Sequence, residues 1–188
     1  SSPLLLMLRE PAAVAGFSAQ QWEMLLWHAR TTRLSGRVWH QLEKTGIVPS
    51  VPDPVARRLK AAFVEAEHHR RVLLWETDRL HRVFGGTGIS FILLKGAAYA
   101  AAGLDLAYGR PAGDIDVLVA QEAIPAAERL LLNHGWEHVI DNAYDQQYYR
   151  RWMHELPPLR HSVRESELDL HHAIAPRTSR LKPNMSLI

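Results

Sequence analysis

The pattern of apolar and polar positions predicts helices throughout the first part of the chain. The longest expected helix carries apolar residues at helical spacing, namely Val55, Leu59, Phe63, Ala66, Leu73, Leu80 and Phe84. Asp53 is a favourable N-cap for it, and Pro54 stands at the first helical position, where a missing N–H does no harm. Two glycines, Gly85 and Gly86, then end the helix.

Two shorter helices are expected before the proline-rich break "VPSVPDP". Ser18 and Gln21 have the spacing of a capping box, so one helix is predicted from there to about Thr31. The second is predicted from about Leu34 to Lys44. Residues 1–86 are therefore interpreted as a helical module.

After Gly88 the pattern changes to short apolar, branched runs that alternate with short helices. Strands are expected at residues 89–94, 115–119 and 136–140, an antiparallel pair at 159–163 and 167–174, and helices at 96–103 and 125–135. The sequence thus predicts an α+β (mixed α/β) fold, with the helical module packed beside a small mixed sheet. Residues 87–188 are expected to form the second domain.

The stretch "GRPAGDIDVLV" at residues 109–119 places two aspartates in an otherwise apolar strand. Residues two apart in a strand point to one face, so Asp114 and Asp116 are expected to project together. Buried carboxylates are costly unless they are paired or bind a metal. Oxygen ligands in this arrangement favour Mg²⁺ or Mn²⁺, and two such ions clamp the attacking and leaving oxygens of a phosphoryl group. The alternative is a surface turn or edge strand, with an aspartate paired to Arg110.

A third acid, Asp169, lies in the predicted strand "SELDLHHAI". It shares a strand face with Glu167 and His171, while Leu168 and Leu170 face the other way. An acid on a neighbouring strand can ligate metal and polarise an acceptor hydroxyl. His171 can orient Asp169 or contact substrate. A solvated edge-strand position for Asp169 and a structural role for His171 are the alternatives.

The residues that turn the first strand into a small-residue helix are suited to a phosphate. Gly96 allows backbone N–H groups to approach an anion closely. Lys95 and Arg110 add positive charge on the flanks. The alternative readings are a lysine that extends to solvent from a strand end, and an Arg110 paired with Asp105 or Asp114.

These segments together resemble a known family. "LLKGAAYAAAGLDLAYGRPAGDIDVLV" and "ELDLHHAI" look like the polymerase-β-type nucleotidyltransferases, and more closely their bacterial branch of "nucleotidyltransferase family proteins". That branch repeats a Lys-Gly turn, an Arg-x-x-x-Asp-x-Asp strand and a later Asp-Leu-His, and the resemblance covers about residues 89–174. It implies that Asp114 and Asp116 bind metal, and that Asp169 completes the metal site and helps to deprotonate the acceptor.

The resemblance also implies that the turn at Gly96 holds the triphosphate of a nucleoside triphosphate. The broader superfamily has Gly-Ser where this chain has Gly96-Ala97, so a hydroxyl contact to phosphate is absent. Lys95 or Arg110 is the expected substitute.

The predicted function is transfer of a nucleoside monophosphate from an NTP to an acceptor hydroxyl on a small molecule or protein, with Mg²⁺ or Mn²⁺ as cofactor. One alternative is a catalytically silent nucleotide-binding or regulatory protein of the same fold, antitoxin-like or an assembly partner. Another is that the chain is part of a longer enzyme, because "RLKPNMSLI" gives no clear structural closure.

Composition excludes several other classes. The chain has no cysteine, which rules out disulfides, thiolate metal sites and thiol nucleophiles and suits a cytoplasmic location. Its 22 Lys and Arg are nearly matched by 20 Asp and Glu, so nucleic-acid binding is not indicated. The apolar run at residues 3–8 is too short for a membrane span. His154 and Glu155 could begin a His-Glu-x-x-His zinc motif, but the prolines that follow break the helix that this motif requires.

Overall fold

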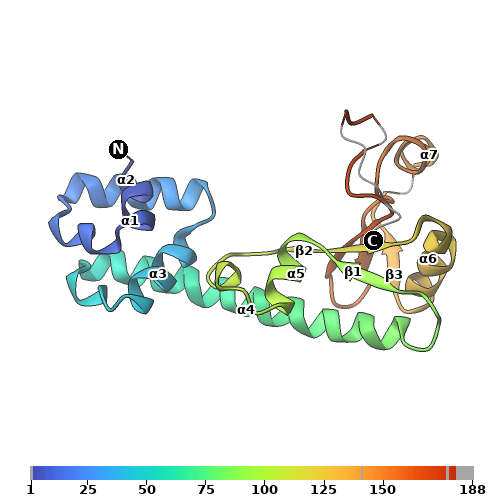
Figure 1. Cartoon of the computed structure of the whole chain (residues 1–188), viewed down its shortest axis with the longest axis horizontal. Helices are drawn as coiled ribbons and strands as arrows, with labels where there is room; N and C mark the ends of the chain where they lie inside the picture. The colour runs from blue at the N-terminus through green and yellow to red at the C-terminus, as the bar shows by residue number, and fades with distance from the viewer. Residues whose placement is uncertain (1, 141, 177, 181–188) are drawn as a thin grey trace. The chain divides into compact units, whose positions relative to one another are not determined.

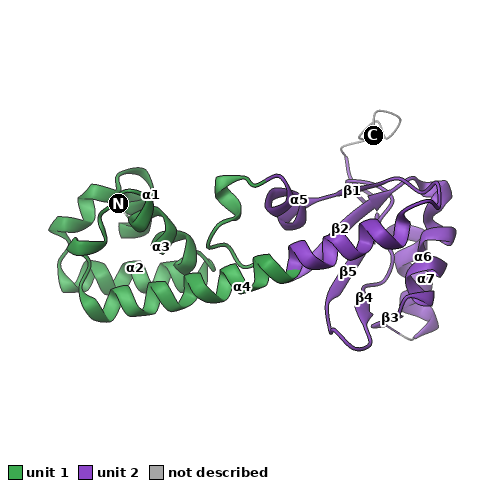
Figure 2. Cartoon of the chain, turned by 90° about the horizontal axis from the view of Figure 1, so that it is seen from below, with its two compact units in different colours: residues 1–72, 103–112 green, residues 73–102, 113–188 purple. Residues whose placement is uncertain are grey.

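The computed structural model describes residues 2–140, 142–176 and 178–180 (Figure 1). Two compact units are present, which Figure 2 distinguishes by colour. One comprises residues 1–72 and 103–112, and the other residues 73–102 and 113–188. The expected domain boundary near residue 86 stays a prediction.

The first unit is helical. Its elements are α1 (Pro3–Arg9), the 3-10 turns η1 (Pro11–Gly16), η2 (Val48–Ser50) and η3 (Asp105–Ala107), α2 (Ala19–Thr31), α3 (Ser35–Lys44) and the first part of α4 (Asp53–Phe84). The capping box at the start of α2 is complete, because Ser18 and Gln21 each accept a hydrogen bond from the other's backbone N–H. The three helices predicted before Gly85 are present as α2, α3 and α4, whereas α1 was not predicted. Its apolar residues contribute Leu4 and Met7 to the core.

Two glycines allow a close backbone approach within this unit. A Cβ atom on Gly109 would lie only 2.3 Å from the carbonyl oxygen of Gly36, and Gly109 also has a φ of +69°. The backbone N–H of Gly109 donates to Glu67 Oε1 of α4 at 3.1 Å. Residues 103–112 are therefore held against α3 and α4 by backbone fit.

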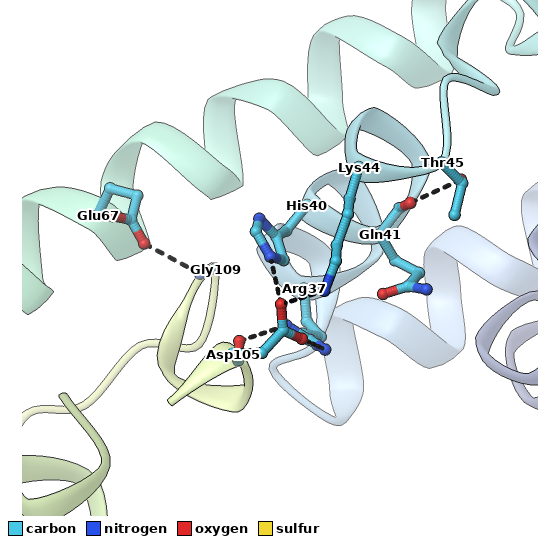
Figure 3. A network of polar contacts seen from close by, with 8 residues as sticks. All are labelled: Arg37, His40, Gln41, Lys44, Thr45, Glu67, Asp105 and Gly109. Atoms are coloured by element: carbon cyan, nitrogen blue, oxygen red, sulfur yellow. Dashed lines mark hydrogen bonds and ion pairs between the residues drawn. The ribbon is translucent and has the colours of Figure 1, made fainter. Parts of the chain in front are cut away.

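A polar network also anchors this segment (Figure 3). Asp105 accepts hydrogen bonds from Arg37 and Lys44 of α3, and Nε2 of His40 lies 3.2 Å from its Oδ1. These interactions hold the pKa of Asp105 far below its usual range, through Lys44 first and then Arg37 and His40. Asp105 therefore stays ionised and binds η3 to α3.

The second unit contains a five-stranded mixed sheet. Its strands are β1 (Phe91–Leu93), β2 (Asp114–Val119), β3 (Trp136–His138), β4 (Leu159–His161) and β5 (Glu167–His171), in the order β1-β2-β5-β4-β3. Only the β2–β5 pair is parallel among these. The helices are α5 (Lys95–Ala101), α6 (Ile124–Asn133) and α7 (Ala143–Trp152), with the 3-10 turn η4 (Gln121–Ala123). The α+β prediction is confirmed, and the described strands all follow the last residue of α4; α7 was not predicted.

The register of β2 against β5 positions the acidic residues. Asp114 pairs with Glu167 and Asp116 with Asp169, so these side chains share one face of the sheet. The opposite face is apolar, and Ile115, Val117, Leu168 and Leu170 on it are all buried. The apolar face fixes the register, because a slip by one residue would turn the acids of one strand into the apolar core.

Candidate active site

Asp116 lies at the centre of a charged cluster in the second unit, and only 1% of the residue's surface is exposed. Nζ of Lys95 lies 2.5 Å from its Oδ1, and Nε2 of His171 lies 2.9 Å from the same atom. Burial alone would raise the pKa of Asp116, but the hydrogen bonds from His171 and Lys95 outweigh burial and lower it. Asp116 is therefore an ionised carboxylate below the protein surface.

Asp114 is exposed at the beginning of β2, two residues before Asp116. Strand β2 therefore carries one solvent-exposed acid, Asp114, and one buried acid, Asp116. A ligand that arrives from solvent can contact Asp114 first and then reach the buried carboxylate.

Asp169 is partly buried and pairs in register with Asp116. Burial raises its pKa to about 6, and the negative charges of Glu155, Asp116 and Asp114 add to the effect. A carboxyl with this pKa exchanges its proton near neutral pH. It is therefore suited to act as a general base.

These side chains fit a divalent cation. Asp116, Asp169 and His171 each offer a ligand atom, and the three atoms lie within 4.8 Å of one another. Desolvated carboxylates that repel one another are stabilised by a bound cation. Oxygen donors suit Mg²⁺ or Mn²⁺.

Two members of this region were missed by the sequence analysis. Glu155 forms an isolated β-bridge with His171, and Leu156 N–H donates to the carbonyl oxygen of Leu170 at 2.9 Å. The chain before β4 thus extends the antiparallel pairing with β5, and this brings His154 and Glu155 to the cluster. They could have been found by extending the predicted antiparallel pair toward the N-terminus, past Pro157 and Pro158.

Lys95 has an unusual backbone, with a φ of +45° in the left-handed region at the start of α5. A residue other than glycine pays a cost for this conformation, and such strain collects at functional sites. The hydrogen bond to Asp116 raises the pKa of Lys95. Its ammonium group therefore contacts a carboxylate here, and its predicted phosphate contact stays a prediction.

The other predicted phosphate-binding residues lie in different places. Gly96 and Ala97 follow Lys95 in α5, and Ala97 is fully buried. Arg110 belongs to the other compact unit, so its phosphate role stays a prediction.

The comparisons with known proteins gave one result. A family model described as "Uncharacterised nucleotidyltransferase" matches residues 18–188. No curated protein and no solved structure matches the chain significantly. The matched region includes every residue of the cluster around Asp116. Among the described residues, none of the helices combines the length and apolarity needed to cross a membrane.

Proposed function

We propose that this chain, which belongs to the uncharacterised nucleotidyltransferase family, transfers a nucleoside monophosphate from an NTP to an acceptor hydroxyl. Pyrophosphate leaves as the new phosphodiester bond forms, and the proton of the acceptor hydroxyl is removed. The observation that carries the proposal is the pairing of Asp116 with Asp169 across two parallel strands, with Asp114 exposed two residues before Asp116.

In this proposal Asp114, Asp116 and Asp169 hold Mg²⁺ or Mn²⁺. The bound cations supply charge neutralisation for the reacting phosphate oxygens. Asp116 is ionised at neutral pH and is therefore ready to act as a ligand. Asp169 is the proposed acceptor of the proton of the acceptor hydroxyl; its pKa of about 6 applies to the protein without a bound cation, which would lower it.

His171 and Lys95 act on Asp116 in this proposal. His171 is fully buried and fixes the orientation of the Asp116 carboxylate through Nε2. Lys95 neutralises Asp116 in the absence of cations, and its exposed side chain can swing to the triphosphate when cations replace it. The turn at Gly96 and Ala97 brings backbone N–H groups to that triphosphate. Direct substrate contact by His171 and phosphate binding by Arg110 remain secondary predictions.

A nucleotide screen tests the proposal. The melting temperature is measured with each of the four NTPs and Mn²⁺, for the wild type, Asp116→Asn and the matched control Glu137→Gln, an exposed acid of β3. A nucleotide at about a hundred times its Kd adds roughly 2.7 kcal/mol to stability. Stabilisation is expected in the wild type and the control and not in Asp116→Asn. If no NTP stabilises the wild type in the presence of metal, the proposal is wrong.

The second candidate is a silent nucleotide-binding protein of the same fold. The observation that favours it is the direct contact between Lys95 and Asp116, together with alanine at position 97. The two candidates differ in turnover, because the silent protein binds NTP and Mn²⁺ but releases no pyrophosphate and labels no acceptor. A pyrophosphate-release assay with cell extract as the source of acceptor, compared between wild type and Asp116→Asn, distinguishes them.

A further inference from the structure

A second group of ligand atoms lies on the other side of the His171 ring from Asp116. Glu155 Oε2 lies 3.3 Å from Nδ1 of His171 and 3.6 Å from Nε2 of His154. One ligand atom from each of these three residues falls within 4.8 Å of the others. The two imidazole ring centroids are 5.2 Å apart. Two imidazole nitrogens and one carboxylate oxygen thus converge at one point.

One ring nitrogen of His171 is engaged by Asp116, and the other faces Glu155. The ionised carboxylate of Asp116 only accepts hydrogen bonds, so Nε2 of His171 carries the proton that it donates to Oδ1. Nδ1, on the other side of the ring, faces Oε2 of Glu155 at 3.3 Å. Nδ1 of His171 is buried and has no hydrogen-bond partner among the described residues. Buried polar atoms are rarely left in this state, and a cation between Nδ1 and Oε2 of Glu155 would satisfy both atoms.

The distances fit a tetrahedral metal ion. Zinc binds imidazole nitrogen and carboxylate oxygen at about 2.0–2.2 Å, so neighbouring ligand atoms around it lie about 3.3–3.6 Å apart. The separations of Glu155 Oε2 from the two histidines are 3.3 and 3.6 Å. Two of the three edges among these ligand atoms therefore match such a tetrahedron, and both distances are long for hydrogen bonds.

We propose that His154, Glu155 and His171 form a second metal site, which takes Zn²⁺ or a similar transition metal ion. Two imidazoles and a carboxylate suit zinc better than magnesium, in contrast to the oxygen ligands of Asp114, Asp116 and Asp169. His171 is closed to solvent, but the side chains of His154 and Glu155 are 18% and 19% exposed. The metal therefore enters from their side, where water takes the fourth position.

This site acts on Asp116 through His171. A metal on Nδ1 keeps the proton on Nε2, so the ring can only donate to Asp116. The zinc thereby fixes the tautomer and the orientation of His171, and through it the Asp116 carboxylate. Zinc is a positioning ion here and takes no part in the transfer reaction. The site does not depend on that reaction.

The test is metal binding by the full chain after its metals have been removed with a chelator. Co²⁺ is added as a spectroscopic probe, because tetrahedral Co²⁺ absorbs visible light strongly, and Zn²⁺ is then added to displace it. One tightly bound ion per chain is expected. His154→Ala and Glu155→Gln should each weaken binding at least tenfold. Circular dichroism verifies that both variants are folded, and NMR of the His171 ring nitrogens reports ligation at Nδ1 directly.

Two controls make the result specific. His68→Ala removes an exposed histidine of α4 and should leave the binding of Co²⁺ and Zn²⁺ unchanged. Asp114→Asn should abolish Mn²⁺-dependent nucleotide binding but retain Zn²⁺, so failure of the proposed function and failure of the zinc site are distinguishable. The inference is overturned if Zn²⁺ does not bind. A proton between Nδ1 of His171 and Oε2 of Glu155 would then account for their contact. It is also overturned if Zn²⁺ binds equally to His154→Ala, or is lost only in Asp114→Asn.

Discussion

Asp105 in the first unit and Asp116 in the second are both ionised, but their surroundings are opposite. Asp105 is 45% exposed and receives Arg37, His40 and Lys44, so positive groups surround one acid (Figure 3). The side chain of Asp116 is 2% exposed and contacts Lys95 and His171, while further acids lie close to it. The first cluster lowers the pKa of its acid. The second also lowers the pKa of Asp116, but it raises the pKa of the neighbouring Asp169 to about 6.

The difference separates a structural cluster from a binding site. Around Asp105 the opposite charges are paired with one another and exposed to water. Such exposed ion pairs contribute little to stability, and the cluster needs no bound ion to balance its charge. Around Asp116 the carboxylates are desolvated, and their repulsion is a cost that a divalent cation relieves. Each of the following changes tests this comparison.

The largest effect on stability is expected at Gly109, in the segment that carries the exposed cluster. A Cβ there would lie 2.3 Å from the Gly36 carbonyl oxygen, and the φ of +69° disfavours other residues. Gly109→Ala should lower the free energy of unfolding by about 2–4 kcal/mol, measured by urea denaturation. Gly46→Ala is the control, since Gly46 has a similar φ of +72° with nothing within 4 Å of the added atom. Equal effects of the two changes would show that backbone fit does not anchor this segment.

Asp116→Asn is expected to have the next largest effect in the absence of metal. The change removes the charge that Lys95 and His171 contact, so we expect a loss of about 1–3 kcal/mol in the free energy of unfolding. Thermal denaturation with and without Mn²⁺ measures it, and Mn²⁺ should no longer stabilise the variant. A variant that Mn²⁺ stabilises as much as the wild type contradicts the assignment.

Asp169→Asn should instead stabilise the metal-free protein. The pKa of Asp169 rises from 3.8 to about 6 on folding, so the folded state binds more protons between these values and the wild type loses stability as pH rises through this window. The variant does not titrate and should gain about 1–2 kcal/mol over the wild type above pH 6, after solvent screening is allowed for. Urea unfolding as a function of pH measures the gain.

The gain should vanish below about pH 3.8, where Asp169 is protonated in both states. A loss of stability in Asp169→Asn at high pH would mean that Asp169 is held by an attractive partner. Turnover should fall more than NTP binding in this variant, because the role proposed for Asp169 is at the acceptor hydroxyl.

The smallest effect is expected for Asp105→Asn. Exposed ion pairs contribute about 1 kcal/mol or less, and salt screens them. The melting temperature should therefore fall slightly at low ionic strength and remain unchanged at high ionic strength, with no change in Mn²⁺ binding. A large loss that persists in salt would mean that the exposed cluster is as important for stability as the buried one.

Much of the fold could be predicted because local signals determine it. The capping box at Ser18 and the helical spacing up to Phe84 define helices without reference to the rest of the chain. The alternation around Asp114, Asp116 and Asp169 defines which acids share a face. Helix α7 carries few apolar residues in a repeating pattern, and none of its residues is buried, so its sequence gave no such signal.

The partners of the site residues could not be predicted, since they depend on long-range pairing. The parallel register joins Asp116 to Asp169 across more than fifty positions in the chain, and Lys95 contacts Asp116 across 21 positions from a left-handed backbone. His154 and Glu155 reach His171 because pairing resumes beyond two prolines, which in the sequence only argue against a helix.

The most direct test of the central claim is a Mn²⁺ titration near neutral pH, with free Mn²⁺ followed by electron paramagnetic resonance in the presence of NTP. Wild type, Asp116→Asn and Asp105→Asn are compared, because the two variants each remove one ionised aspartate from one of the two clusters. The account predicts Mn²⁺ binding in the wild type and in Asp105→Asn, and its loss in Asp116→Asn. Equal binding by all three proteins would contradict it.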